Sequence, residues 1–346
     1  MHIPDGYLSP QTCAVMGAAA LPVWIAAAQK IKKSLQTRFV PLMAVGAAFS
    51  FVIMMYNVPI PDGTTAHAVG GALLAIVLGP WGACLAISVA LLIQALLFGD
   101  GGIWAFGANA FNMAFILPFS SFYIYSLIAG KSPASSFRRW LGGFVAGYAG
   151  LNLAALAAAV EFGLQPVFFH TPAGAPLYCP YPLNLAVPAM AFAHLAIAGP
   201  IEGIITALAV RYLQAASPSL LTPETSTGPK ADLKPGIISR FWWGIVILIL
   251  LAPVGLLAQG TAWGEWGMDE LKELLGFVPP GLEKLSEWWS APLPDYSLPG
   301  AAEGGFAASA LWYIVSAVIG VIIIGGISYL FSKAARSRKK GETTSI

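Results

Sequence analysis

The sequence predicts an all-α polytopic membrane protein, with a bundle of seven transmembrane helices followed by a two-helix unit. Hydrophobic residues make up 57% of the chain and charged residues only 10%, whereas soluble domains carry roughly 25% charged residues. Long charge-free stretches have the length that a bilayer-spanning helix needs. Sixteen of the 18 lysines and arginines, all except Lys272 and Lys284, lie on the side that the positive-inside rule assigns to the cytoplasm.

Residues 1–213 are expected to form the seven-helix domain. Basic residues follow the first, fifth and seventh helices, so the amino terminus is expected outside the cell. A turn at Gly79-Pro80 separates the third helix from the fourth. Thr64 or Thr65 is expected to cap the third helix and to place His67 in its first turn. The approximate helix ranges are 11–29, 39–56, 66–79, 81–98, 103–128, 140–162 and 183–213.

A polar stretch at 214–236, rich in Pro, Ser and Thr, is typical of a linker and is expected in the cytoplasm. The next domain, 237–335, contains two predicted spans that are joined by an outer segment with eight acidic residues. Residues 336–346 form a basic cytoplasmic tail. The two spans and a short amphipathic helix in the outer segment have the approximate ranges 241–258, 311–331 and 268–275.

Several functions are excluded by composition and motif. In a membrane protein the net charge of +2 gives no indication of nucleic-acid binding. Cys13, Cys84 and Cys179 are isolated, which predicts buried thiols rather than disulfides or a zinc site. The chain has no P-loop for ATP and neither an HExxH motif nor an evident nucleophile for a membrane hydrolase. We therefore expect a protein that is not an enzyme.

The amino-terminal dipeptide Met1-His2 has the composition of a metal chelate. Its terminal amine, the amide of His2 and the His2 imidazole, bound through Nδ1, would close a five-membered and a six-membered ring. His67 is the best candidate for a fourth nitrogen, because the chain has only four histidines. A flat set of four nitrogens favours Ni(II) or Cu(II) over Zn(II). The alternative is that His2 is merely a frayed end residue, but the charge pattern places both ligand sources on the outer side.

Three polar residues near the proposed ligands could support the metal-binding backbone. Gln94 and Asn109 flank the FGDGG loop at 98–102, and Thr65 precedes His67 by two positions. A role in bridging helices is the alternative for Gln94 and Asn109.

His194 and Glu202 lie eight residues apart on the seventh predicted helix, so they share one of its faces. Ionisable groups inside a membrane are costly and often functional. Glu202 is expected too deep in the membrane for a metal site at the outer surface. We therefore expect both residues to form hydrogen bonds between helices.

Four sequence motifs resemble those of the NikM/CbiM family, the substrate-capture (S) components of energy-coupling-factor transporters for nickel and cobalt. The resemblance covers about residues 1–213. Residues 240–331, with PDYSLPG at 294–300, resemble the small NikN-type partner, fused behind the capture domain. The four motifs are MHIPDGYLSP, PDGTTAH followed by GGALLAIVLGPW, LLIQALLFGDGGIWAFGANAFNMA and AHLAIAGPIEGIITAL.

The resemblance implies a seven-helix capture protein whose amino terminus plugs an outer cavity. It implies metal ligation by the terminal amine, by the backbone and imidazole nitrogens of His2, and by His67. It also implies a transmembrane coupling (T) subunit and two cytoplasmic ATPases as partners, in the cytoplasmic membrane of a prokaryote. Nickel is favoured as the substrate, with cobalt for cobalamin supply as one alternative and a passive divalent-metal permease as another. Because the ligands must lose protons, binding is expected to weaken as the pH falls through the imidazole range.

Overall fold

The computed structural model describes residues 1–31, 39–61, 63–221, 236–258, 260–300 and 304–343. The predicted basic residues Lys32, Lys33 and Arg38 and most of the predicted linker lie outside these residues. The helices before the linker are α1 (Pro10–Ile31), α2 (Phe39–Met54), α3 (Gly71–Ile93), η1 (Gln94–Phe98), α4 (Phe106–Asn109), η2 (Ala110–Ile116), α5 (Leu117–Ala129), α6 (Phe137–Phe168), α7 (Leu183–Ala193), η3 (His194–Ala198), α8 (Gly199–Ala216) and η4 (Pro218–Leu221).

The carboxyl-terminal unit pairs two long helices with a segment of short ones. Its elements are α9 (Ile237–Leu251), η5 (Ala252–Leu257), α10 (Met268–Leu275), α11 (Pro280–Ser286), η6 (Pro294–Tyr296) and α12 (Gly305–Thr343). The predicted short helix at 268–275 is confirmed as α10, and α12 continues into the predicted tail.

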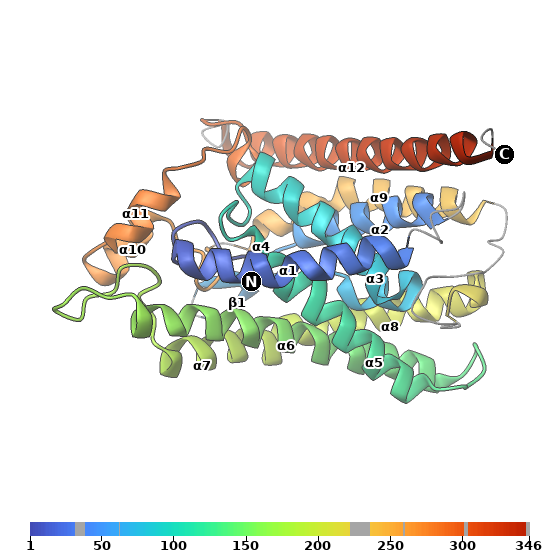
Figure 1. Cartoon of the computed structure of the whole chain (residues 1–346), viewed down its shortest axis with the longest axis horizontal. Coiled ribbons are helices and arrows are strands. Elements are labelled where there is room, and N and C mark those ends of the chain that lie inside the picture. Colours follow the sequence, from blue (N-terminus) through green and yellow to red (C-terminus); the bar gives the residue numbers. More distant parts are fainter. Residues whose placement is uncertain (32–38, 62, 222–235, 259, 301–303, 344–346) are drawn as a thin grey trace.

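The predicted class is confirmed: the protein is an all-α polytopic membrane protein. Among the described residues, seven helical segments are long and apolar enough to cross a membrane, and α2 is a shorter apolar helix. The long helices run side by side along the long axis of the molecule (Figure 1). Large apolar side chains such as Leu127, Leu208 and Ile322 are exposed on these helices, as expected for surfaces that face lipid.

The helix α3 is a hairpin of two helical segments that reverses at Gly79, whose φ of 73° and ψ of 162° are not helical. Before the reversal, Gly70 lies beside Phe49 and Ile53 of α2, and Leu74 and Leu78 lie beside Gly46. After the reversal, Gly82 lies against Phe39 at the beginning of α2. Phe98 then lies beside Phe51, near the other end of α2. The predicted turn at Gly79-Pro80 is therefore confirmed.

The predicted beginning of the third helix is wrong. Thr64–Ala66 forms a strand, β2, which pairs in antiparallel register with β1 (Val58–Ile60). β-branched threonines suit such a strand better than a helix. The helix begins only at Gly71, after Gly70 with a φ of 73°. His67 thus lies in the connection between β2 and α3, and neither Thr64 nor Thr65 caps a helix.

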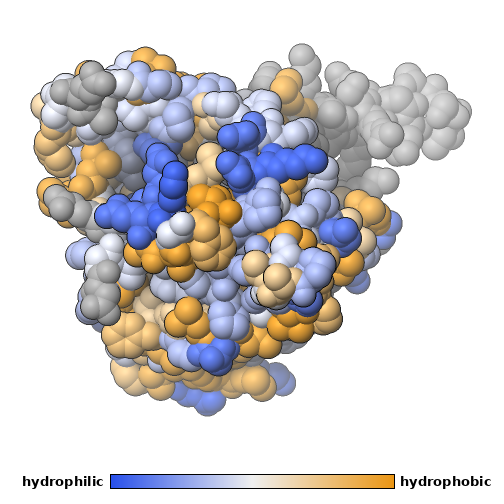
Figure 2. Space-filling view, turned by 90° about the vertical axis from the view of Figure 1, so that its left-hand side faces the viewer, coloured by the Kyte–Doolittle hydropathy of each residue, from blue (hydrophilic) through white to orange (hydrophobic). Residues whose placement is uncertain are grey.

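The segment between α9 and α12 covers one end of the bundle, on the left in Figure 1. Figure 2 views this end directly and shows hydrophilic side chains gathered on it among apolar ones. Helices α9 and α12 both pack on α2. The Tyr313 hydroxyl donates to the Met55 carbonyl at 2.7 Å, and the Tyr56 hydroxyl donates to the Leu248 carbonyl. The carboxyl-terminal unit is therefore joined to the amino-terminal helices by buried contacts.

Candidate metal centre

The amino terminus is buried in the covered end of the bundle. Met1 is 4% exposed, His2 1% and Ile3 0%. The Asn109 side chain accepts a hydrogen bond from the Ile3 amide at 2.7 Å and donates one to the Ile3 carbonyl at 3.0 Å. The Gly102 amide donates to the same carbonyl at 2.8 Å. His2 is therefore held in place by the residue that follows it and is not a frayed end.

The FGDGG loop fits around this terminus because its glycines allow close approach. Gly101 has a φ of 86°, and a Cβ there would lie 3.0 Å from Asn109 Nδ2 and 3.5 Å from His2 Cδ2. A side chain at Gly102 would collide with Asp5. The Asp5 carboxylate accepts hydrogen bonds from the amides of Ile103 and Ala105 at 2.9 and 3.2 Å. Hydrogen bonds and close packing thus fix the loop and the amino-terminal segment to each other.

The imidazole rings of His2 and His67 lie together in the interior. Their centroids are 5.0 Å apart and the rings are stacked, with 29° between their planes. His67 Nδ1 lies 3.1 Å from the Ala68 carbonyl, so the tautomer with hydrogen on Nδ1 satisfies that contact and leaves Nε2 with a free lone pair. His67 Nε2 and both ring nitrogens of His2 are buried and have no hydrogen-bond partner among the described residues. These are nitrogen atoms available to a metal ion.

Asp100, in the FGDGG loop, brings a carboxylate to the histidines. Its Oδ1 lies 2.9 Å from His2 Nδ1, without hydrogen-bond alignment. Its Oδ2 accepts hydrogen bonds from the Gln94 amide at 3.0 Å and from the Tyr296 hydroxyl. Burial acts to raise the pKa of Asp100, but His2, His67 and the Tyr296 hydroxyl together hold that pKa below its usual range. The loop therefore places a negative charge beside the histidines.

The Met1 amine is ion-paired with Glu265, from the segment between α9 and α12. The Tyr7 hydroxyl donates to the carbonyl of the adjacent Trp266 at 2.8 Å. Gly6, with a φ of 92°, lies against the backbone of Leu282 so closely that a Cβ would be 2.5 Å from its carbonyl oxygen. The carboxyl-terminal unit is therefore in direct contact with the amino-terminal segment.

The structure brings together Met1, His2 and His67, and Asn109 forms hydrogen bonds with the backbone of the adjacent Ile3. Gln94 supports Asp100 rather than the metal-binding backbone. Thr65 is buried in β2, and no hydrogen bond within the described residues joins its hydroxyl to the cluster. The sequence prediction did not include three residues of the cluster: Asp100, Glu265 and Tyr296.

Glu202 does form the expected contact between segments, but with backbone rather than with a side chain. Its carboxylate accepts hydrogen bonds from the amides of Val69 and Gly70 at 2.9 Å each and from Ala72 at 3.2 Å. These amides lie at the amino terminus of α3, where an anion is favoured. His194 instead lies 2.8 Å from the Met190 carbonyl of its own helical segment. Glu202 thus anchors the chain that follows His67.

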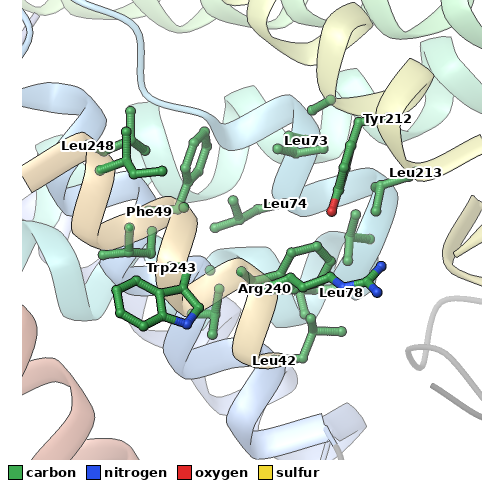
Figure 3. Close-up of a pocket in the computed structure, with 18 residues that line it drawn as sticks. Leu42, Phe49, Leu73, Leu74, Leu78, Tyr212, Leu213, Arg240, Trp243 and Leu248 are labelled. Carbon is green, nitrogen blue, oxygen red and sulfur yellow. The ribbon is translucent and has the colours of Figure 1, made fainter. Parts of the chain in front are cut away.

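A cavity of about 620 Å³ lies away from this cluster, between α2, α3, α8 and α9. Figure 3 shows apolar side chains such as Phe49, Leu74 and Trp243 around it. The described residues that line it include neither a histidine nor a carboxylate. The histidine cluster is therefore the better candidate for a metal centre.

Burial, with help from His2 and the terminal amine, lowers the pKa of His67 to about 3. His67 thus stays neutral through the imidazole range and cannot cause the expected loss of metal binding there. Because the folded pKa lies below the unfolded value near 6.5, stability is lost as the pH falls below 6.5. Between pH 7 and 5 the loss is about 2 kcal/mol. Thermal unfolding of the metal-free protein should show this loss. The free energy of unfolding of His67→Gln should fall by correspondingly less between pH 7 and 5.

The exposed His170 provides the control for that measurement. His170→Gln should lose as much stability between pH 7 and 5 as the unsubstituted protein. Equal losses in His67→Gln and His170→Gln would contradict a lowered pKa at His67.

Replacing Asn109 with Ala should weaken binding of the expected nickel ion by about 10- to 100-fold, the usual effect of removing a group that orients a metal ligand. Both hydrogen bonds to Ile3 would be lost, and the adjacent His2 backbone would be free to move. Asn184, which is exposed, offers a matched control. In calorimetric titrations, Asn184→Ala should bind nickel with the affinity of the unsubstituted protein. If Asn109→Ala binds nickel with that same affinity, Asn109 only bridges helices.

Comparison with known families assigns the chain to one of them. The sequence model of CbiM, described as the cobalt uptake substrate-specific transmembrane region, matches residues 2–220. The chain belongs to the CbiM family. The model of the PDGLE domain matches residues 239–337, so this CbiM-family chain carries a second, fused domain as the resemblance implied.

Curated relatives of this CbiM-family chain include fused nickel transport proteins. The fused nickel transport protein NikMN of Rhodobacter capsulatus is 50% identical, over 99% of this chain and 100% of its own length. The probable fused nickel transport protein LarMN of Lactiplantibacillus plantarum is 44% identical, over 93% and 95%. The cobalt transport protein CbiM of Lachnoclostridium phytofermentans is 38% identical over 37% of this chain and 52% of its own.

A solved structure described as a transition metal transporter is 60% identical to this chain. It aligns with a TM-score of 0.59 and covers 62% of this chain and 92% of its own length. The chain is therefore similar to metal transport proteins in both sequence and fold.

Proposed function

We propose that this CbiM-family chain is the substrate-capture component of an energy-coupling-factor transporter that imports Ni(II). Met1, His2 and His67 would hold the ion through the terminal amine, the backbone and imidazole nitrogens of His2, and Nε2 of His67. The observation that carries the proposal is the buried pair of histidines, in which His2 Nδ1 and His67 Nε2 have no hydrogen-bond partner among the described residues. Leaving such groups unpaired is costly, and a metal ion would satisfy them.

The ligand set also supports nickel as the substrate. Four nitrogens in one plane suit Ni(II), whereas Co(II) accepts this geometry less readily. The nickel names of two relatives that align along most of the chain favour the same ion. Cobalt remains the alternative substrate, as the name of a shorter relative indicates.

Substitution of the histidines tests the proposed ligands. Purified protein with a native amino terminus should bind nickel more tightly than cobalt, and His2→Ala or His67→Ala should weaken nickel binding by roughly a hundredfold or more. His170→Ala is the matched control, because His170 is exposed and should be dispensable. Nickel binding in His2→Ala and His67→Ala at the affinity of the control would refute this ligand set.

The expected partners are a transmembrane coupling subunit and two ATPases on the cytoplasmic side, with the amino terminus outside. Nickel uptake into vesicles that contain all the subunits should stop when the ATPases are omitted. Uptake that persists without them would support the passive permease instead.

A further inference from the structure

Two carboxylates lie beside the proposed chelate and form a cluster with His2, which is also a residue of that chelate. One ligand atom from each of His2, Asp100 and Glu265 lies within 4.8 Å of the other two. Asp100 Oδ1 is 2.9 Å from His2 Nδ1, and Glu265 is paired with the Met1 amine. The atoms could therefore surround one ion next to the nitrogen site.

The carboxylates are also the part of the cluster that still reaches solvent. The side chains of Asp100 and Glu265 are 19% and 17% exposed, whereas those of Met1 and His2 are each 1% exposed. An ion that enters from solvent meets the carboxylates first. Two negative charges at the mouth of a buried site also attract a divalent cation and speed its association.

The His2 imidazole provides an independent sign of a ligand. Both of its ring nitrogens are buried without a hydrogen bond to any described residue, and Nδ1 faces the Asp100 carboxylate. A buried polar atom without a partner is uncommon and usually has a functional or solvent explanation. Here a cation between the ring and the carboxylates would provide the missing partner.

We propose that Asp100, Glu265 and the His2 imidazole form a loading site for hydrated Ni(II), from which the ion passes to the chelate of Met1, His2 and His67. The proposal rests on the proposed function, because both sites use His2. Oxygen ligands suit a hydrated octahedral ion, and nitrogen ligands suit the final flat one.

Transfer between the two sites is an exchange of ligands. Glu265 leaves the Met1 ammonium to take the ion, and His2 Nδ1 remains a ligand throughout. The bond from nickel to the Glu265 oxygen then breaks as the bond to the Met1 nitrogen forms. The His2 amide nitrogen and Nε2 of His67 replace the Asp100 oxygen and the remaining bound water, and the amide proton passes to bulk water. The ammonium proton passes to bulk water, since the amine must be neutral to bind the metal.

One consequence concerns the fused PDGLE domain. Glu265 lies in this domain, and its backbone neighbour Trp266 is fixed to Tyr7 by a hydrogen bond. The domain therefore supplies half of the carboxylates of the loading site. Its contribution is expected in the rate of nickel loading rather than in the final ligand set.

The rate of nickel association in Glu265→Gln tests the loading site. Nickel alone is mixed with the purified full-length protein, and binding is followed by quenching of tryptophan fluorescence; Trp263 and Trp266 flank residue 265. The association rate at low salt should fall about tenfold, as for the loss of electrostatic steering. The dissociation rate and the absorption spectrum of the loaded protein should not change. Glu273→Gln, an exposed position in α10, is the matched control and should load at the normal rate.

A second measurement compares how the association rates of the two proteins depend on salt. The association rate of the unsubstituted protein should fall more steeply with ionic strength than that of Glu265→Gln, because salt screens exposed carboxylates. An unchanged rate in Glu265→Gln, or an association rate of the unsubstituted protein that is independent of salt, would overturn the loading site. So would an altered final spectrum in Glu265→Gln, which would make Glu265 a ligand of the final site.

His2→Ala separates failure of the loading site from failure of the proposed function. If His2→Ala loses nickel while Glu265→Gln loads at the normal rate, the chelate stands and the loading site is wrong. If His2→Ala binds nickel with the normal spectrum, the chelate itself is wrong, and so is the loading site that shares its imidazole.

Discussion

A protein with one extra residue before Met1 should bind nickel at least a hundredfold more weakly than the native chain. The extension converts the terminal amine into an amide and moves His2 to the third position. Structural zinc sites with four protein ligands hold their ion with about 10–16 kcal/mol, and on that scale one ligand corresponds to about 3 kcal/mol, or roughly a hundredfold. Met1 is only 4% exposed, so the added residue would also have to displace packed neighbours.

Nickel titration of the extended and native proteins measures this effect. The control is the extended protein after an aminopeptidase has removed the added residue, which should restore the native affinity. Equal affinities before and after removal would mean that the amine is not a ligand.

Glu202→Ala is expected to lower the free energy of unfolding by about 3–9 kcal/mol. The substitution leaves three buried backbone amides, of Val69, Gly70 and Ala72, without their acceptor, and each unsatisfied donor costs about 1–3 kcal/mol. Such a loss is a large part of the 5–15 kcal/mol that stabilises a typical protein. Nickel affinity should fall as well, because these amides follow His67 directly.

Thermal unfolding with and without nickel checks that prediction. Leu208→Ala is a suitable control, since Leu208 lies on the same helix and is 61% exposed. Glu202→Gln keeps an oxygen acceptor, so its melting temperature should lie between those of the control and Glu202→Ala. A melting temperature of Glu202→Ala equal to that of the control would contradict an anchoring role for Glu202.

The membrane helices could be predicted because their signals are local. A bilayer demands long apolar helices, and Gly79-Pro80 interrupts one of them where the sequence indicates. The beginning of α3 could not be predicted in this way. The capping signal at Thr64 and Thr65 competes with pairing to β1, and it is the partner strand that decides.

The histidines of the candidate site could be predicted from chemistry, since an amine, an amide and an imidazole are joined in one dipeptide. Glu265 could not, because it is one of eight acidic residues in its segment and only the folded chain selects it. Asp100 lies within a loop motif whose glycines were the more visible signal. Its role depends on the ring of His2, 98 positions away along the chain.

X-ray absorption spectroscopy of the nickel-loaded full-length protein, with its native amino terminus, is the most direct test of the proposed chelate. We expect Ni(II) with four nitrogen ligands in a square-planar arrangement, including two imidazoles. Loss of one imidazole in His67→Ala should be visible in the same spectra. A six-coordinate ion bound mainly by oxygen, unchanged in His67→Ala, would contradict the assignment of Met1, His2 and His67 as the nickel ligands.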